Sequence, residues 1–251
     1  NRASYDAAGQ CMGGYAFVNG FPDPMPPMKA VPYTCDYTTT LNVAWMSLAA
    51  YICAQRTGKG ESIDLAQFEV MTKLMAHYPA TAAMDGVALG RSGNDDPTFA
   101  GYSLYPCGDG NYVFVGAVGK NPLKKLVYKI GLQDHEEYFD DMQMATRALY
   151  PKFAVDLDEA IKAYCADKTS LEVDAIFAEE GVPSAPVMTL VQALDHPHYI
   201  ARGVWAEWDD PTYGTMKGVN AYPVNAKNNP AQIWRGAPLY GADTRDVLAD
   251  F

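Results

Sequence analysis

The sequence has few histidines and no cysteine pair of the kind that binds a metal. Its four histidines are scattered, and none stands at metal-ligand spacing from a cysteine. His196 and His198 flank a turn at Pro197, which favours a structural role. We therefore expect no metal site. We also expect reduced, buried thiols, because disulfides are rare in the cytoplasm. The cysteines are Cys11, Cys35, Cys53, Cys107 and Cys165.

Long apolar runs are also absent. A membrane-spanning helix needs roughly 20 consecutive apolar residues, and no segment comes near that length. No charged segment followed by an apolar stretch opens the chain, so no signal peptide is expected. These absences favour a cytoplasmic protein. The chain starts at Asn1 rather than at a methionine, and we expect the natural start to lie upstream.

Positive charge is scarce. The chain has 19 Lys and Arg residues against 30 Asp and Glu residues, a net charge of −11. So acidic a protein repels nucleic acid and anionic membrane surfaces. A polyphosphorylated ligand would need a local basic patch to bind.

The hydrophobic patterns predict a mixed α and β fold. Alternating runs at 102–106 and 112–118 surround Asp109-Gly110, which is a strong hairpin signal. Further extended segments are expected at 61–66, 183–187, 204–208 and 215–219. Helices are expected early in 3–18, at 36–55, 67–84, 122–130 and 147–165, at 171–179 with Thr169 or Ser170 as N-cap, and after Asp243 or Thr244.

Two of these helices carry a regular apolar face. In the helix expected at 36–55, apolar residues recur at three- and four-residue steps, which predicts a buried face. Those residues are Leu41, Ala44, Trp45, Leu48, Tyr51 and Ile52. The helix expected at 67–84 is rich in Met and carries Tyr78; such a stripe would suit an apolar pocket, but it is more often core.

Several stretches together resemble the class III CoA-transferase family, also called CaiB/BaiF. They are residues 32–37 (PYTCDY), 57–69 (TGKGESIDLAQFE) and 229–244 (NPAQIWRGAPLYGADT), with 196–203 (HPHYIARG) as a weaker match. In this order and spacing, the stretches together are specific to this family. The opening residues 2–6 (RASYD) and the late WRGAP segment are most similar to the bile-acid and carnitine branch.

The resemblance implies an α/β fold in two parts. Part of a doubly wound large domain is joined by long linkers to a smaller α+β domain, and two subunits interlock as rings in a dimer. On that template, residues 1–66 are a large-domain segment, 67–92 a linker helix, 93–190 the small domain, and 191–251 the return linker and large-domain segment. The N-terminal coenzyme-binding part of the family has no counterpart in the chain.

The resemblance also implies an activity, the transfer of coenzyme A between carboxylic acids. Asp36 matches the family's nucleophile, which reacts through mixed anhydrides and an aspartyl-CoA thioester. Acyl-CoA and a bile-acid-like or carnitine-like carboxylate are then substrates, and no cofactor is permanently bound. On the residues alone, an aspartate at the start of a helix is typical of an N-cap, worth about 1 kcal/mol. The two roles are compatible, because a helix N-terminus also stabilises a carboxylate.

Three more residues are candidates for substrate binding. Tyr5 and Asp6 match positions near the nucleophile in some relatives; Asp6 could position a substrate acid, or the pair could be a surface turn. Relatives that act on oxalate carry a run of glycines where this chain has only Gly101. Backbone N–H groups near Gly101 could still hold an oxyanion.

Two alternatives remain open. One is an acyl-CoA racemase of the same fold, which pairs the aspartate with an upstream histidine that we place outside this chain. The other is a non-catalytic or truncated partner subunit. The lack of basic residues for the coenzyme's phosphates favours the latter, because this chain alone should then bind CoA poorly.

Overall fold

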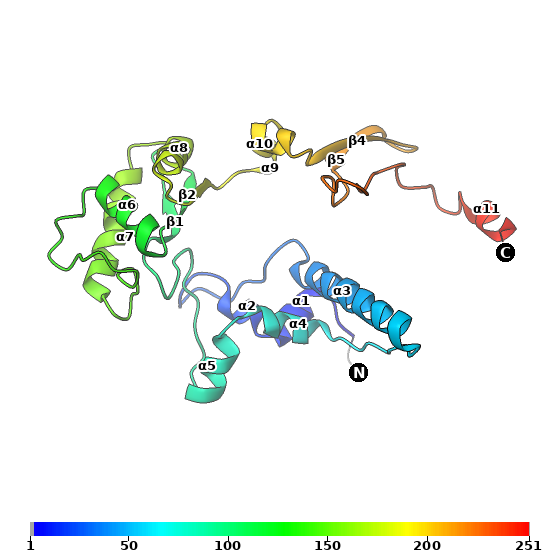
Figure 1. The fold of residues 1–251 in the computed structure, drawn as a ribbon, viewed down its shortest axis with the longest axis horizontal. Coiled ribbons are helices and arrows are strands. Elements are labelled where there is room, and N and C mark those ends of the chain that lie inside the picture. Colours follow the sequence, from blue (N-terminus) through cyan, green and yellow to red (C-terminus); the bar gives the residue numbers. More distant parts are fainter. Residues whose placement is uncertain (1–2, 251) are drawn as a thin grey trace. The chain divides into compact units, whose positions relative to one another are not determined.

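The computed structural model describes residues 3–250 of the chain, which divide between Pro186 and Val187 into two compact units (Figure 1). Asn1, Arg2 and Phe251 lie outside the described residues. Mixed helices and short antiparallel strands make up both units, as the hydrophobic patterns predict.

Five helices form the first part of the first unit. They are α1 (Asp6–Met12), α2 (Tyr15–Val18), α3 (Thr34–Thr57), α4 (Gln67–Leu74) and α5 (Tyr78–Asp85). Helix α1 packs against both α3 and α4. Glycines allow this close approach: a Cβ on Gly9 would lie 2.5 Å from Cys35 Sγ, and one on Gly13 would lie 2.7 Å from the Phe68 carbonyl oxygen.

Replacing Gly13 by valine should therefore loosen the α1–α4 contact. The added carbon atoms would meet both the Phe68 backbone and the Met71 side chain, and overpacking of this kind typically costs about 1–3 kcal/mol. The free energy of unfolding from urea titration followed by circular dichroism measures the effect. Gly60→Ala is the matched control, because a Cβ there meets no atom within 4 Å. Equal stabilities of the two variants would contradict the packing described.

The second part of the first unit is a small α+β core. Its sheet has the order β1-β2-β3, antiparallel throughout, with Leu104 opposite Phe114. The strands are β1 (Tyr102–Pro106), β2 (Tyr112–Gly116) and β3 (Ser184–Pro186), and the helices are α6 (Lys120–Lys129), α7 (Pro151–Cys165) and α8 (Ser170–Glu180). Alternate residues Val113 and Val115 point into a core that they share with Leu157 and Phe177. The hairpin prediction and the Thr169 N-cap are confirmed.

A buried carboxylate ties this core together. Asp158 on α7 is 7% exposed. It accepts hydrogen bonds from the Tyr105 hydroxyl at 2.5 Å and the Gly101 N–H at 3.0 Å, and it pairs with Arg147 at 2.7 Å. Burial and the nearby Asp158 carboxylate raise the pKa of the Tyr105 hydroxyl, so it stays a donor to this carboxylate at neutral pH.

The second unit contains the remaining elements. They are α9 (Leu190–Leu194), α10 (Pro197–Ala201), the antiparallel pair β4 (Trp205–Asp210) and β5 (Gly214–Val219), and α11 (Thr244–Ala249). Trp205 anchors the hairpin to α9, because its indole N–H donates to the Ala193 carbonyl at 3.1 Å. Its ring also stacks on Tyr199.

Three sequence predictions are wrong. The helix expected at 67–84 is two helices, because Pro79 has no N–H for the helical bond and Ala76 takes a left-handed φ of 49°. Residues 61–66 form no strand, since no described strand pairs with them. Asp36 is not an N-cap, because α3 begins at Thr34.

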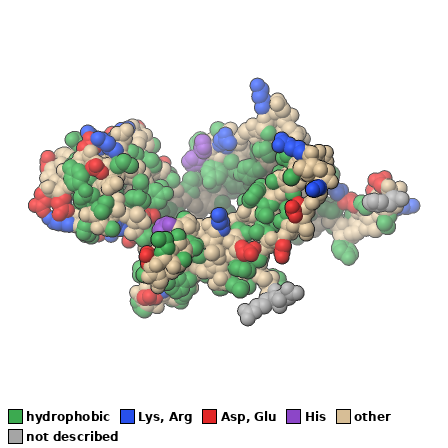
Figure 2. Space-filling model, turned by 60° about the horizontal axis from the view of Figure 1, so that its bottom comes forward, with side chains coloured by type: hydrophobic (Ala, Val, Ile, Leu, Met, Phe, Trp, Pro, Cys, Tyr) green, Lys and Arg blue, Asp and Glu red, His purple; other side chains and the backbone are tan. Residues whose placement is uncertain are grey.

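The predicted buried face of α3 is not buried within the described chain. Only α1 and α4 have substantial contacts with α3 in the described chain, and Leu41, Trp45 and Leu48 are each at least half exposed. Hydrophobic side chains reach the surface in Figure 2, where they are drawn in green. Apolar residues also occur off the predicted face, as at Val43; a helix that is apolar on several sides is normally covered in the assembled protein.

Candidate functional site

The candidate site is centred on Asp36, in the first turn of α3. Tyr33, the residue before the helix, has a left-handed φ of 43°, which is uncommon for a residue with a side chain. Strained backbone of this kind persists where the surroundings hold it in place. The backbone conformation at Tyr33 sets the direction in which α3 starts. This direction in turn sets the position of the half-buried Asp36 side chain.

Asp6 caps α3 from the neighbouring helix. Its Oδ1 accepts from the backbone N–H of Cys35 at 2.8 Å and of Asp36 at 3.2 Å. The first N–H groups of a helix have no partner within the helix, and a carboxylate there also interacts favourably with the helix dipole. The structure therefore brings Asp6 and Asp36 together, with Asp6 holding the backbone of the residue that carries the second carboxylate.

Gln10 completes the support of Asp6. It lies one turn further along α1 and is fully buried. Its amide donates to Asp6 Oδ2 at 2.7 Å and to the Ala30 carbonyl at 3.0 Å, and its oxygen accepts from the Ala30 N–H at 2.9 Å. Because Asp6 is 8% exposed and both of its oxygens are used, its geometry fits a support for α3 better than the predicted contact with a substrate acid.

Gln67 contacts the Asp36 carboxylate directly. Its amide nitrogen donates to Asp36 Oδ1 at 2.6 Å, and its amide oxygen accepts from the Ser4 hydroxyl at 2.9 Å. Within residues 3–250, Asp36 Oδ2 has no hydrogen-bond partner, and neither Asp6 nor Asp36 forms an ion pair. One oxygen of Asp36 is thus held, and the other is left for chemistry.

Tyr5 and Gly101 lie in contrasting surroundings. Tyr5 precedes α1 and its side chain is 84% exposed. Gly101 is buried, and its N–H is used by Asp158. None of the contacts described for Gly101 involves the Asp36 site, so the geometry does not favour its predicted role as an oxyanion donor. The substrate contacts of Tyr5 and Gly101 stay predictions.

Sequence reasoning missed Gln10 and Gln67. The first had a usable signal, because a glutamine four residues after Asp6 lies on the same side of a helix and can bond to it. For Gln67 the signal was weak: it is one polar residue in the apolar surroundings of Ala66 and Phe68. Its partner Asp36 lies 31 residues away in the chain, and no local pattern reveals such a contact.

The thiol of Cys35 lies beneath the site and should be unreactive. Burial raises the pKa of this thiol, and the carboxylates of Asp6 and Asp36 raise it further. Burial also raises the pKa of Cys107, and it raises the pKa of Cys165 to about 12. The prediction that all five cysteines are buried is wrong for Cys11 and Cys53, which are exposed.

Brief treatment with iodoacetamide at pH 8 should therefore alkylate Cys11 and Cys53 alone. The thiolate is the nucleophile, whereas the other three cysteines are buried, and burial raises the pKa of each of these thiols. Peptide mass spectrometry measures the extent of reaction, with urea-unfolded protein as the control in which all five react. Rapid alkylation of Cys35 in the folded chain would contradict the packing of the site.

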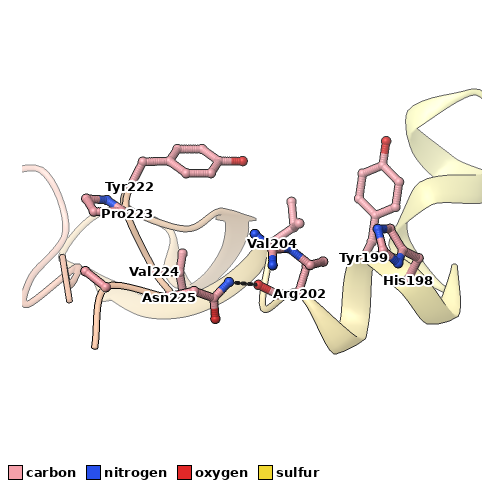
Figure 3. A pocket seen from close by; sticks show the side chains of 9 residues that line it. His198, Tyr199, Arg202, Val204, Tyr222, Pro223, Val224 and Asn225 are labelled. Carbon is pink, nitrogen blue, oxygen red and sulfur yellow. Dashed lines mark hydrogen bonds between the residues drawn. The ribbon is translucent and has the colours of Figure 1, made fainter. Parts of the chain in front are cut away.

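The described residues contain no group of three or more His, Cys, Asp or Glu side chains that could hold a metal ion. Across the same residues, no helix has the length and apolar character to span a membrane. A separate pocket of about 500 Å³ lies in the second unit, and its lining includes His198, Arg202, Tyr222 and Val224 (Figure 3). It contains none of the predicted site residues.

The chain belongs to CoA-transferase family III, whose family model matches residues 1–244. Among curated proteins it is similar to the bile acid CoA-transferase BaiK of Clostridium scindens, with 39% identity over 254 residues. That match covers 100% of this chain and 57% of BaiK. The chain therefore spans a little over half the length of this relative.

Solved structures share the fold. A CaiB/BaiF family protein from Brucella suis matches with a TM-score of 0.75 and 24% identity, covering 99% of this chain and 63% of that one. The hypothetical protein Rv3272 from Mycobacterium tuberculosis matches with a TM-score of 0.72 and 19% identity, covering 98% and 63%. Both matches bear on the fold alone.

Proposed function

We propose that this chain carries the nucleophile of a CoA-transferase, which moves coenzyme A from an acyl-CoA to a second carboxylic acid. The observation that carries the proposal is the Asp36 carboxylate, with Oδ1 held by Gln67 and Oδ2 without a partner. Membership of CoA-transferase family III supports it. An ionised carboxylate needs no general base, and its use splits a difficult exchange into feasible steps.

The first half of the reaction forms a thioester on Asp36. Oδ2 attacks the acyl carbon of the substrate, and the C–S bond breaks to release CoA thiolate, leaving a mixed anhydride. The thiolate then attacks Asp36 Cγ. The bond from Cγ to Oδ2 breaks, the first acid leaves with that oxygen, and Asp36 is left as a CoA thioester. The incoming acid reverses these steps, so neither ATP nor a permanently bound cofactor is required.

For the acceptor we propose a bile-acid-like carboxylate. The support is the 39% identity to a protein named as a bile acid CoA-transferase. A carnitine-like acid is the second candidate. The racemase alternative is not favoured, because the curated relative is named as a transferase.

The domain organisation and the intertwined homodimer are also proposals. The exposed apolar face of α3 supports a second copy of the chain as its cover. Light scattering should give the mass of a dimer; a monomeric mass at micromolar concentration would contradict this assembly.

The function is tested by CoA exchange. The chain is incubated with a bile-acid acyl-CoA and an isotopically labelled second bile acid, without ATP, and mass spectrometry follows labelled acyl-CoA. We expect label in the acyl-CoA pool. Deuterium exchange next to the thioester carbonyl, without transfer of CoA, would favour a racemase. No reaction by the folded chain would overturn the proposal and favour the partner-subunit alternative.

A further inference from the structure

Gln67 makes the one hydrogen bond that the described residues offer to the Asp36 carboxylate. Gln67 is the first residue of α4, whereas Asp36 lies in the first turn of α3, so two helix starts meet at this contact. Helix α1 passes close to both: a Cβ on Gly9 would lie 3.0 Å from Gln67 Cβ. The position of Gln67 is thus fixed by the same packing that positions Asp6.

The orientation of the amide follows from the chemistry of its partners. An ionised carboxylate can only accept hydrogen bonds, so the amide must present its nitrogen to Asp36. The hydroxyl of Ser4 then donates to the amide oxygen at 2.9 Å. This arrangement leaves an N–H group aimed at Oδ1 and at no other atom of Asp36.

We infer that Gln67 is the donor that stabilises negative charge on Asp36 Oδ1 when the CoA thiolate attacks Cγ. This inference rests on the proposed function. As the S–Cγ bond forms, the electron pair of the Cγ=Oδ1 bond moves to Oδ1. When the bond from Cγ to Oδ2 breaks, that pair returns, and the acid leaves as a carboxylate. A preorganised donor at the site of developing charge stabilises such a transition state.

The geometry has a second consequence, which concerns the fate of the two oxygens. Every turnover replaces the oxygen that attacks the acyl carbon, because it leaves with the first acid and is resupplied by the second. If Gln67 holds Oδ1, only Oδ2 takes part. With an acceptor labelled by ¹⁸O at both carboxyl oxygens, Asp36 should then take up a single label and stop.

The experiment compares the wild-type chain with Gln67→Met and Gln67→Glu, which keep the length of the side chain and remove the donor. Mass spectrometry of the Asp36 peptide follows ¹⁸O after many turnovers, and steady-state kinetics give kcat and KM. We expect a plateau of one label in the wild type and a rise towards two in both variants. We also expect kcat to fall by about 10²-fold, with KM nearly unchanged.

Gln143→Met is the matched control, because Gln143 is exposed and its side chain has no described partner. It should behave as the wild type does. Circular dichroism and unfolding midpoints establish that each variant is folded. The side-chain amide resonances of Gln67 give a readout independent of turnover: Asp36→Asn should shift them and leave those of Gln143 in place.

The outcomes distinguish a failure of the proposed CoA-transferase function from a failure of the role given to Gln67. No label on Asp36 and no CoA exchange in the wild type would overturn the proposed function, and this inference with it. Wild-type exchange with two labels on Asp36, or with unchanged kcat in both Gln67 variants, would overturn the role of Gln67 alone.

Discussion

Replacing Asp36 by asparagine should lower the rate of CoA exchange by at least about 10³-fold, because it removes the nucleophile on which both half-reactions depend. The asparagine side chain has nearly the same shape and can still accept a hydrogen bond from Gln67 through its oxygen. Stability should therefore change little, and the loss should fall on kcat. Initial rates of labelled acyl-CoA formation measure the effect.

A matched control separates the loss of a nucleophile from the loss of a charge. Asp85 is an exposed aspartate at the end of α5, with no described side-chain partner. Asp85→Asn makes the same chemical change away from the site and should keep the wild-type rate. Full activity of the Asp36→Asn variant would remove Asp36 from the mechanism.

Replacing Asp158 by alanine should destabilise the small α+β core by about 3–5 kcal/mol, as expected when one partner of a buried pair is removed. The change leaves the Tyr105 hydroxyl, the Gly101 N–H and the Arg147 guanidinium without their shared acceptor. One nitrogen of that guanidinium, Nη2, is already buried without a partner among the described residues. A loss of this size is a large share of the stability of a typical domain.

Urea unfolding followed by near-ultraviolet circular dichroism, which reports on the packed tyrosines, measures this loss. Glu159→Ala is the control on the same helix. Glu159 pairs with Lys162 at the surface, and exposed pairs of this kind contribute about 0–1 kcal/mol. Comparable stabilities for Asp158→Ala and Glu159→Ala would show that the buried network does not support the core.

The elements that could be predicted from the sequence are those with local signals. The Asp109-Gly110 turn and the Thr169 cap each act over a few residues, and both are present as expected. Predictions failed where the outcome depended on distant partners. The apolar pattern of α3 shows that the helix needs a cover, but it cannot show that the described chain provides none for Leu41 or Leu48.

The candidate site, too, could be predicted only in part, because several of its contacts join residues that are distant in the chain. The resemblance singled out Asp36 and Asp6, and the structure brings the two together. The resemblance could not reveal that Asp6 caps α3, because this cap depends on the close packing of α1 at Gly9. Nor could it reveal Gln67, whose contact with Asp36 arises where two helices start side by side.

Trapping the covalent intermediate on Asp36 tests the proposed mechanism without relying on turnover. The chain is incubated with acyl-CoA alone, treated with hydroxylamine, digested, and examined by mass spectrometry for the peptide that contains Asp36. We expect a hydroxamate at Asp36 that is absent from the Asp36→Asn variant. A folded chain that turns over acyl-CoA while Asp36 stays unmodified would contradict this mechanism.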